Sequence, residues 1–214
     1  MADVTLYGFP FSSFTWSARL ALEEKRVPYR LEPVEMWSEA HRALHPFKKI
    51  PILKHGDTIV FESSAIMRYV DMMFDGPALQ PAEPMRRVRM EQWLSAHNDY
   101  AVKTILGVII YQRMIVPNFL GGTPDEAAIA AAMPRVREIL GIIDGALAGS
   151  GCFAGPEVSL ADFMYLPTLT HLGSVAEGRG LLDGYPNLAR WAAAMAARPS
   201  VTVTTPAPQQ AAAA

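Results

Sequence analysis

Two different spacings of hydrophobic residues divide the chain. Up to residue 75, short β-rich runs alternate with segments in which hydrophobic residues fall on one helical face. Such runs are typical of strands, and such spacing is typical of helices. In chain order the pattern predicts strand 4–7, helix 12–25, strand 29–34, helix 38–44, strands 50–53 and 58–61, and helix 63–74. The order βαβ, α, ββα therefore predicts an α/β unit.

From residue 85 onward the spacing is helical throughout, which predicts an all-helical second unit. A long segment covers 86–115, and a last helix covers 187–197. Between them, Ser159 and Asp162 are spaced as in a capping box, in which each side chain bonds the backbone N–H of the other residue. We therefore expect a helix to begin after Ser159.

Another helix is expected to begin near Thr123. That residue is a suitable N-cap, Pro124 would occupy the first helical position and Glu126 the third. The helix should run toward residue 149. Pro134 lies inside it and is expected either to kink or to interrupt it, because proline has no N–H and its ring collides with the preceding turn.

A proline-rich segment separates the two units. Residues 75–84, DGPALQPAEP, hold three of the 17 prolines of the chain, and proline fixes φ and removes a hydrogen-bond donor. We therefore divide the chain into a first domain at 1–75, a linker at 76–84 and an all-helical domain at 85–201. The low-complexity tail at 202–214 is expected to be disordered.

Composition narrows the function classes. Charged residues make up 19% of the 214 residues, below the roughly 25% of an average domain, which hints at a further buried surface such as a subunit interface. The net charge of −2 excludes the basic footprint of a nucleic-acid-binding protein. Cys152 is the single cysteine, so an internal disulfide and a paired-cysteine zinc site are excluded and no metal is expected. With neither a secretory leader nor an apolar run of about 18 residues, we expect a cytoplasmic protein that does not enter a membrane.

Five segments, in order along the chain, resemble the cytosolic glutathione transferases, nearest the phi and zeta classes. They are similar to the first strand, active-site loop and first helix, to the cis-proline segment, to the segment that grips the glutamyl end of glutathione, to the helical-domain capping motif and to the closing helix. The segments are LYGFPFSSFTWSARLALEEKRVPY, HPFKKIPIL, FESSAIMRYV, VSLADFMYLP and YPNLARWAAAMAARPSV. The resemblance implies a thioredoxin-like N-terminal domain followed by an all-helical C-terminal domain.

The resemblance also implies an activity. Members of this family bind reduced glutathione as a co-substrate and conjugate its thiolate to electrophiles. The partners that it implies are glutathione, a small, apolar electrophile and a second copy of the chain, because family members form homodimers.

Two serines at the start of the first helix are candidates for the group that stabilises the thiolate. Alignment with the phi-class pattern places Ser12 on the catalytic serine, with Ser13 as the alternative. One serine here is also expected to act as the N-cap of the helix. A purely structural role for both is therefore the competing interpretation.

The glutathione-binding candidates come from two segments. The resemblance implies a cis peptide bond before Pro51, which would let Ile50 offer its backbone N–H and C=O to the tripeptide as an added strand does. Lys49 would reach the glycyl carboxylate. Ser63, at a helix N-terminus, would bind the γ-glutamyl carboxylate, and Glu62 would accept from the free ammonium group.

Further candidates depend on position alone, and a packing or surface role is an equal alternative for each. Trp37 and His41 are placed near the glycyl end of glutathione, and Phe9, Phe11, Tyr100 and Tyr111 are candidates for an apolar second-substrate site. Cys152, in a glycine-rich loop, is expected to be a bystander.

Two alternative functions stay open. A glutathione-dependent isomerase or dehalogenase would use the same scaffold, although Phe14 stands where the zeta pattern has a cysteine, which weakens the isomerase interpretation. A non-catalytic interaction domain is the other alternative. The presence of Ser12, Pro51 and Ser63 argues against such a degenerate site.

Overall fold

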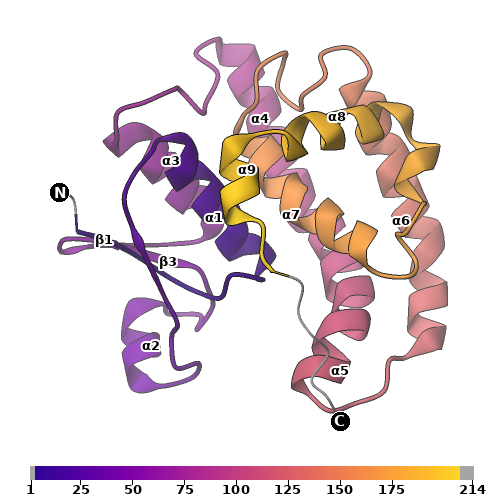
Figure 1. Cartoon of the computed structure of the whole chain (residues 1–214), viewed down its shortest axis with the longest axis horizontal. Helices are drawn as coiled ribbons and strands as arrows, with labels where there is room; N and C mark the ends of the chain where they lie inside the picture. Colours follow the sequence, from indigo (N-terminus) through magenta and orange to yellow (C-terminus); the bar gives the residue numbers. More distant parts are fainter. Residues whose placement is uncertain (1–2, 208–214) are drawn as a thin grey trace.

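Four strands and three helices form the N-terminal part of the chain in the computed structural model, which describes residues 3–207 (Figure 1). The strands are β1 Val4–Tyr7, β2 Arg30–Glu32, β3 Ile52–His55 and β4 Thr58–Phe61, and the helices are α1 Ser13–Glu24, α2 Glu39–Leu44 and α3 Ser63–Met73. The strands pair in the order β2-β1-β3-β4. The predicted thioredoxin-like order of elements, βαβ, α, ββα, is confirmed.

The pairing register brings three loops to one edge of the sheet. β1 runs parallel to β2 and antiparallel to β3, and β3 runs antiparallel to β4. Tyr7 at the end of β1 is opposite Ile52 at the start of β3, and Ile52 is opposite Phe61 at the end of β4. The segments just beyond this row therefore lie together at one edge. They are residues 8–12, 50–51 and 62–63.

Two strands are shorter than or shifted from their predicted positions. The strand expected at 29–34 covers only Arg30–Glu32, since Pro33 has no N–H with which to continue the ladder. The strand expected at 50–53 begins at Ile52, directly after the Ile50–Pro51 peptide bond, which is cis as expected.

From residue 84 the described chain forms helices joined by loops (Figure 1). The long segment predicted at 86–115 is a continuous succession of α4, a π-helix η1 and α5. The elements are α4 Pro84–Ala96, η1 His97–Ile115, α5 Val116–Phe119, α6 Glu126–Leu147, α7 Leu160–Ser174, a short 3-10 helix at Leu182–Gly184, α8 Pro186–Ala196 and α9 Pro199–Thr204. Within residues 3–207, no helix is both long enough and apolar enough to cross a membrane.

The start of α6 differs from the prediction. Asp125, not Thr123, is the N-cap, and its carboxylate accepts the N–H of Ala128 at 2.9 Å. The side chain of Gln112 in η1 accepts the N–H of Asp125 at 2.9 Å, so a contact with a neighbouring helix selects between two suitable capping residues. α6 then continues through Pro134, and the interruption considered there does not occur.

A buried carboxylate organises the core of the helical domain. The predicted pairing is present, because Asp162 accepts both the N–H and the hydroxyl of Ser159 at 2.9 Å. Asp162 is fully buried and also accepts the indole N–H of Trp191 at 2.8 Å and the N–H of Phe153 at 3.3 Å. These donors replace the water that the carboxylate loses on burial.

The C-terminal helix α9 lies against α1 (Figure 1), which corrects the expectation of a disordered tail from residue 202. Thr204 is fully buried and accepts the indole N–H of Trp16 at 2.9 Å. Its carbonyl accepts the guanidinium of Arg19 at 2.8 Å. The remainder of the predicted tail, 208–214, lies outside the described residues.

We predict that Thr204→Val lowers the free energy of unfolding by about 1–3 kcal/mol. Valine keeps the shape of threonine but leaves the buried indole N–H of Trp16 without its acceptor. Thr202→Val is the matched control, because Thr202 is on the same helix and is exposed. Urea-induced unfolding measures both variants, and equal transition midpoints would contradict the prediction.

Candidate active site

A tight turn carries the candidate serines. The N–H of Ser12 donates to the carbonyl of Phe9 at 3.0 Å, which closes a β-turn with Pro10 at its second position, where proline is favoured. Ser12 is the N-cap of α1, and its Oγ accepts the N–H of Thr15 at 3.4 Å. Ser13 is buried in the first turn of α1, whereas Ser12 is only half-buried. Ser12 is therefore the more accessible of the two hydroxyls.

The capping role of Ser12 leaves its proton available. Accepting the N–H of Thr15 uses a lone pair of Oγ, while the O–H is still a donor. The N-terminus of α1 also carries a partial positive charge. The structural interpretation of Ser12 as a cap is thus confirmed and does not conflict with donation to an anion.

Gly8 packs closely against the first turns of α1. A Cβ at Gly8 would lie only 2.4 Å from Oγ1 of Thr15, so a side chain there would require Thr15 to move. The N–H of Gly8 donates to the carbonyl of Glu32 in β2 at 2.9 Å. The turn that carries Ser12 (residues 8–12) is therefore held at the same sheet edge as residues 50–51 and 62–63.

His41 holds the backbone beside the cis-proline. It is fully buried, and its Nδ1 accepts the N–H of Trp37 at 3.2 Å. Nδ1 therefore carries no proton, and Nε2 donates to the carbonyl of Lys49 at 3.0 Å. Both ring nitrogens are thus engaged with backbone, which gives His41 a structural role rather than the direct binding role considered for it.

The side chains of Trp37 and Lys49 are exposed at the same end of the site. The ammonium group of Lys48 lies 5.7 Å from the centroid of the Trp37 ring, within the range of a cation–π contact. Lys49 is free of this contact and is positioned by the His41 bond to its carbonyl. A basic side chain therefore stands next to the cis peptide bond.

The β4–α3 junction has an unusual backbone at Glu62. Its φ is 68°, a left-handed value that is rare outside glycine and costs about 1–3 kcal/mol. Its exposed side chain does not cap α3. Ser63 is buried at the first position of α3, and its hydroxyl lies 3.7 Å from the sulfur of Met164 in α7. The exposed carboxylate and the N–H groups of the first turn of α3 are therefore next to each other.

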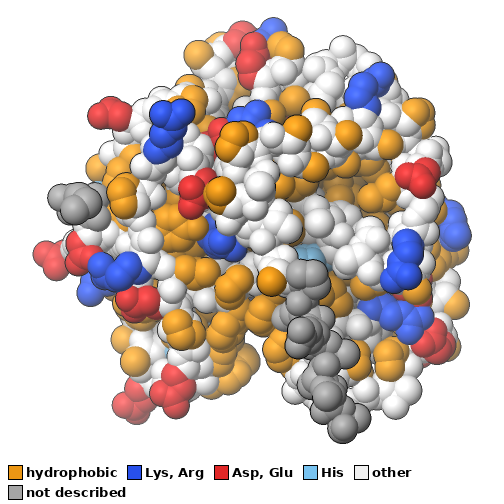
Figure 2. All heavy atoms as spheres, viewed as in Figure 1, with side chains coloured by type: hydrophobic (Ala, Val, Ile, Leu, Met, Phe, Trp, Pro, Cys, Tyr) orange, Lys and Arg blue, Asp and Glu red, His pale blue; other side chains and the backbone are white. Residues whose placement is uncertain are grey.

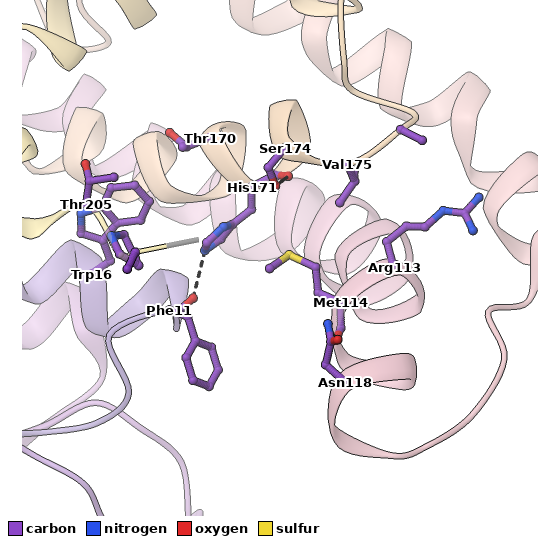
Figure 3. A pocket seen from close by; sticks show the side chains of 13 residues that line it. Phe11, Trp16, Arg113, Met114, Asn118, Thr170, His171, Ser174, Val175 and Thr205 are labelled. Atoms are coloured by element: carbon purple, nitrogen blue, oxygen red, sulfur yellow. Dashed lines mark hydrogen bonds between the residues drawn. The ribbon is translucent and has the colours of Figure 1, made fainter. Parts of the chain in front are cut away.

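A cavity of about 530 Å³ lies between the two domains (Figure 3). Its lining comes from the turn that carries Ser12, η1, α5, α7 and the segment after α9, and includes Phe11, Met114, Asn118, His171 and Val175. Figure 2 shows that the surface is hollowed between the two lobes, with hydrophobic side chains gathered on the side of α2 and the sheet. The cavity is lined by both apolar and polar side chains and adjoins the turn that carries Ser12.

Three aromatic rings form a stack, of which Phe11 lines this cavity. The centroids of Phe9 and Phe11 are 5.7 Å apart, and those of Phe11 and Phe119 are 5.2 Å apart. Two of the predicted second-substrate residues are thus together. The sequence reasoning missed Phe119, although an aromatic residue just after Pro117, at the end of the long helical segment, was a usable signal.

The two candidate tyrosines are not in this stack. Tyr100 lines a different cavity, of about 350 Å³, between the α4–η1 junction and α6, where Arg135 lies 5.7 Å from the centroid of its ring. Tyr111 is exposed on η1 and is not part of the lining of the interdomain cavity. The structure therefore separates Tyr100 and Tyr111 from Phe9 and Phe11.

Charges near the cavity are compensated. The guanidinium of Arg113 bonds the carboxylates of Glu126 and Glu177, which raise its pKa further. Burial raises the pKa of the Cys152 thiol to about 12, so this thiol stays protonated at neutral pH.

Within the part of the chain that the structure describes, no group of three or more His, Cys, Asp or Glu side chains is arranged to hold a metal ion.

Comparison with known proteins agrees with this geometry. Residues 6–78 match the glutathione S-transferase N-terminal domain, and residues 97–199 match the glutathione S-transferase C-terminal domain. Glutathione S-transferase 3 of Zea mays is 32% identical over 95% of this chain and 94% of its own length.

Solved structures give the same result. Glutathione S-transferase III in its apo form superposes with a TM-score of 0.87 at 30% identity, covering 98% of this chain and 100% of that one. Glutathione S-transferase I bound with lactoylglutathione superposes with a TM-score of 0.86 at 27% identity, covering 95% and 98%. The chain belongs to the glutathione S-transferase family.

We predict that His41→Leu lowers the free energy of unfolding by about 1–3 kcal/mol and weakens glutathione binding. The substitution removes the two hydrogen bonds that hold the backbone of Trp37 and Lys49. Arg42→Leu is the control, since Arg42 follows His41 on α2 and is exposed. Chemical unfolding and calorimetric titration with glutathione measure both effects. If His41→Leu is as stable as the control and the wild type, His41 does not hold this segment.

Proposed function

We propose that this protein conjugates reduced glutathione to small, apolar electrophiles, a detoxification reaction, and that the hydroxyl of Ser12 stabilises the glutathione thiolate. The observation that carries the proposal is the position of Ser12. Its hydroxyl stands at the N-terminus of α1 and at the sheet edge that holds the cis-proline, and its cap bond engages only a lone pair.

The groups at that sheet edge match the chemistry of glutathione. In the proposal, the backbone of Ile50 pairs with the cysteinyl part of the peptide as an added strand. Lys49 neutralises the glycyl carboxylate. The first turn of α3, with Ser63, binds the γ-glutamyl carboxylate, and Glu62 accepts from the free ammonium group. Ser63 must turn its hydroxyl away from Met164 to take part.

The energies of these groups are sufficient to form a thiolate. A free thiol has a pKa of about 8.5 and is only a few per cent ionised at neutral pH. A hydrogen bond to a charged group contributes about 1.5–3 kcal/mol, and a helix N-terminus adds about 0.3–1 kcal/mol. Together they lower the pKa of the bound thiol by roughly one to three units, so the reaction needs no general base.

The interdomain cavity supports the choice of electrophile. Its volume of about 530 Å³ falls in the range of roughly 300–1,000 Å³ of small-molecule sites. The stack of Phe9, Phe11 and Phe119 presents aromatic faces beside it, and the charge of Arg113 is taken up by two carboxylates. We therefore assign this cavity to an uncharged, apolar substrate.

We predict that Ser12→Ala raises the pKa of the thiol of bound glutathione by about one to two units and leaves glutathione affinity nearly unchanged. The conjugation rate should fall by less than the thiolate population, because a more basic thiolate is a better nucleophile, with a Brønsted slope of about 0.4–0.5. Ultraviolet titration of the thiolate and calorimetry measure the two quantities.

Ser13→Ala is the matched control for this experiment, since Ser13 is the neighbouring serine and is buried within α1. Glutathione bound to Ser13→Ala should have the same thiol titration as glutathione bound to the wild type. If Ser12→Ala titrates like the wild type and Ser13→Ala does not, the activating group is Ser13. If both titrate like the wild type, no serine activates the thiol.

The assembly proposed with this function is a two-fold homodimer. Phe47, next to the cis-proline segment, is 67% exposed, and the cavity that contains Tyr100, Trp93 and Ile142 opens on the helical domain. In a two-fold pair, Phe47 of each chain would insert into this cavity of the other chain, so the same contact forms twice. Exposed apolar side chains such as Met73 support a covered surface.

We predict a dimer of the 23.4 kDa chain in sedimentation equilibrium at micromolar concentration. Phe47→Asp should shift the equilibrium toward the monomer, because burying a carboxylate in an apolar cavity is costly. Val203→Asp is the control, since Val203 is also exposed but lies on α9. A monomeric wild-type protein would rule out the dimer.

A further inference from the structure

The turn that carries Ser12 receives a hydrogen bond from the helical domain. His171 of α7 lies 3.0 Å, through Nε2, from the carbonyl oxygen of Phe11 (Figure 3). A carbonyl only accepts, so Nε2 carries the proton and donates. Burial lowers the pKa of His171, and its ring packs against Trp16 at a centroid distance of 5.8 Å. The donor is therefore a neutral ring held in place by α1 itself.

The peptide group between Phe11 and Ser12 is bonded at both ends. Its carbonyl accepts from His171 at 3.0 Å, and its N–H, which belongs to Ser12, donates to the carbonyl of Phe9 at 3.0 Å. Hydrogen bonds in such a chain polarise and strengthen one another. The orientation of this peptide plane decides where the Cα–Cβ bond of Ser12 points, and so where its hydroxyl lies.

The aromatic contacts of the turn are less directional. Phe11 stacks on Phe9 and Phe119, and stacked rings tolerate sliding more readily than a hydrogen bond tolerates a change of angle. α7, in contrast, is buried along nearly its whole length. A rigid element is the appropriate support for a group that must be placed within a fraction of an ångström.

We propose that His171 is a positioning residue, which orients the Ser12 hydroxyl toward the glutathione sulfur by holding the carbonyl of Phe11. This inference depends on the proposed role of Ser12. It makes the chemistry of the N-terminal domain depend on one polar contact from the helical domain. Because Phe11 and His171 also line the interdomain cavity, the thiol titration, which needs no electrophile, is the readout that isolates this contact.

The test compares three variants. His171→Leu removes the donor, whereas His171→Gln offers an amide N–H at a similar reach. His97→Leu is the matched control, because His97 is also fully buried in the helical domain but lies 2.8 Å from the hydroxyl of Thr168 and does not bond the turn. Should the leucine variant of His171 fail to fold, His171→Met, which also lacks a donor, replaces it.

The expected result is a selective loss of turnover. His171→Leu should lower kcat about two- to tenfold at a pH below the thiol pKa, with KM for glutathione nearly unchanged, and should shift the ultraviolet titration of bound glutathione upward. His171→Gln should restore most of the lost kcat and should return the titration toward that of the wild type. His97→Leu should lower thermal stability without moving the titration. Combined with Ser12→Ala, His171→Leu should produce no further shift, because the two residues act through one hydroxyl.

Three results would overturn the inference, and they are distinguishable. If Ser12→Ala shifts the thiol titration but His171→Leu does not, His171 is only structural and the proposed role of Ser12 stands. If Ser12→Ala itself has no effect, the role of Ser12 fails and the inference fails with it. A shift of equal size in His97→Leu would also count against His171, since it would assign the effect to general loosening of the helical domain.

Discussion

The burial of α1 on nearly all sides is the constraint on which the rest of the structure depends. The sheet and α3 cover one side of this helix, and α7 and α9 cover the other (Figure 1). A helix in this position must satisfy its polar side chains internally, and the indole N–H of Trp16 does so on α9. Because Ser12 is the N-cap of α1, whatever fixes this helix also fixes the candidate thiolate-stabilising hydroxyl.

Backbone groups and side chains both contribute to the candidate site. Strand pairing brings the turn that carries Ser12, the cis-proline segment and the start of α3 to one edge. The main chain offers donors and acceptors there beside the side chains of Ser12, Lys49 and Glu62. Two buried histidines, His41 and His171, each donate to a carbonyl beside this edge. A rigid backbone with buried support loses little conformational freedom when a ligand binds to it.

Local patterns predicted most of the fold, and long-range contacts account for the differences. The order of elements and the Ser159–Asp162 pair follow from signals within a few residues, whereas the cis Pro51 bond was expected from the family resemblance. The cap of α6 was misplaced because Gln112, in another helix, selects Asp125. Similarly, the TVTTPAPQQ composition after Val201 gave no sign that Thr204 is buried against Trp16, 188 positions earlier. The role of His171 depends on the backbone of Phe11, 160 positions earlier, which spacing does not reveal.

The bond between the first and last helices has a consequence for synthesis. Arg198 and Ser200 bond the carboxylate of Glu24 at 2.7 and 2.5 Å, and Thr204 completes the surroundings of Trp16. Domains generally fold from the N-terminus as they leave the ribosome, yet here the N-terminal domain lacks one wall until nearly the whole chain has emerged. A chain released before α9 is made would thus expose an apolar side of α1. Chaperones and proteases would then bind the N-terminal domain, although the missing residues are at the C-terminus.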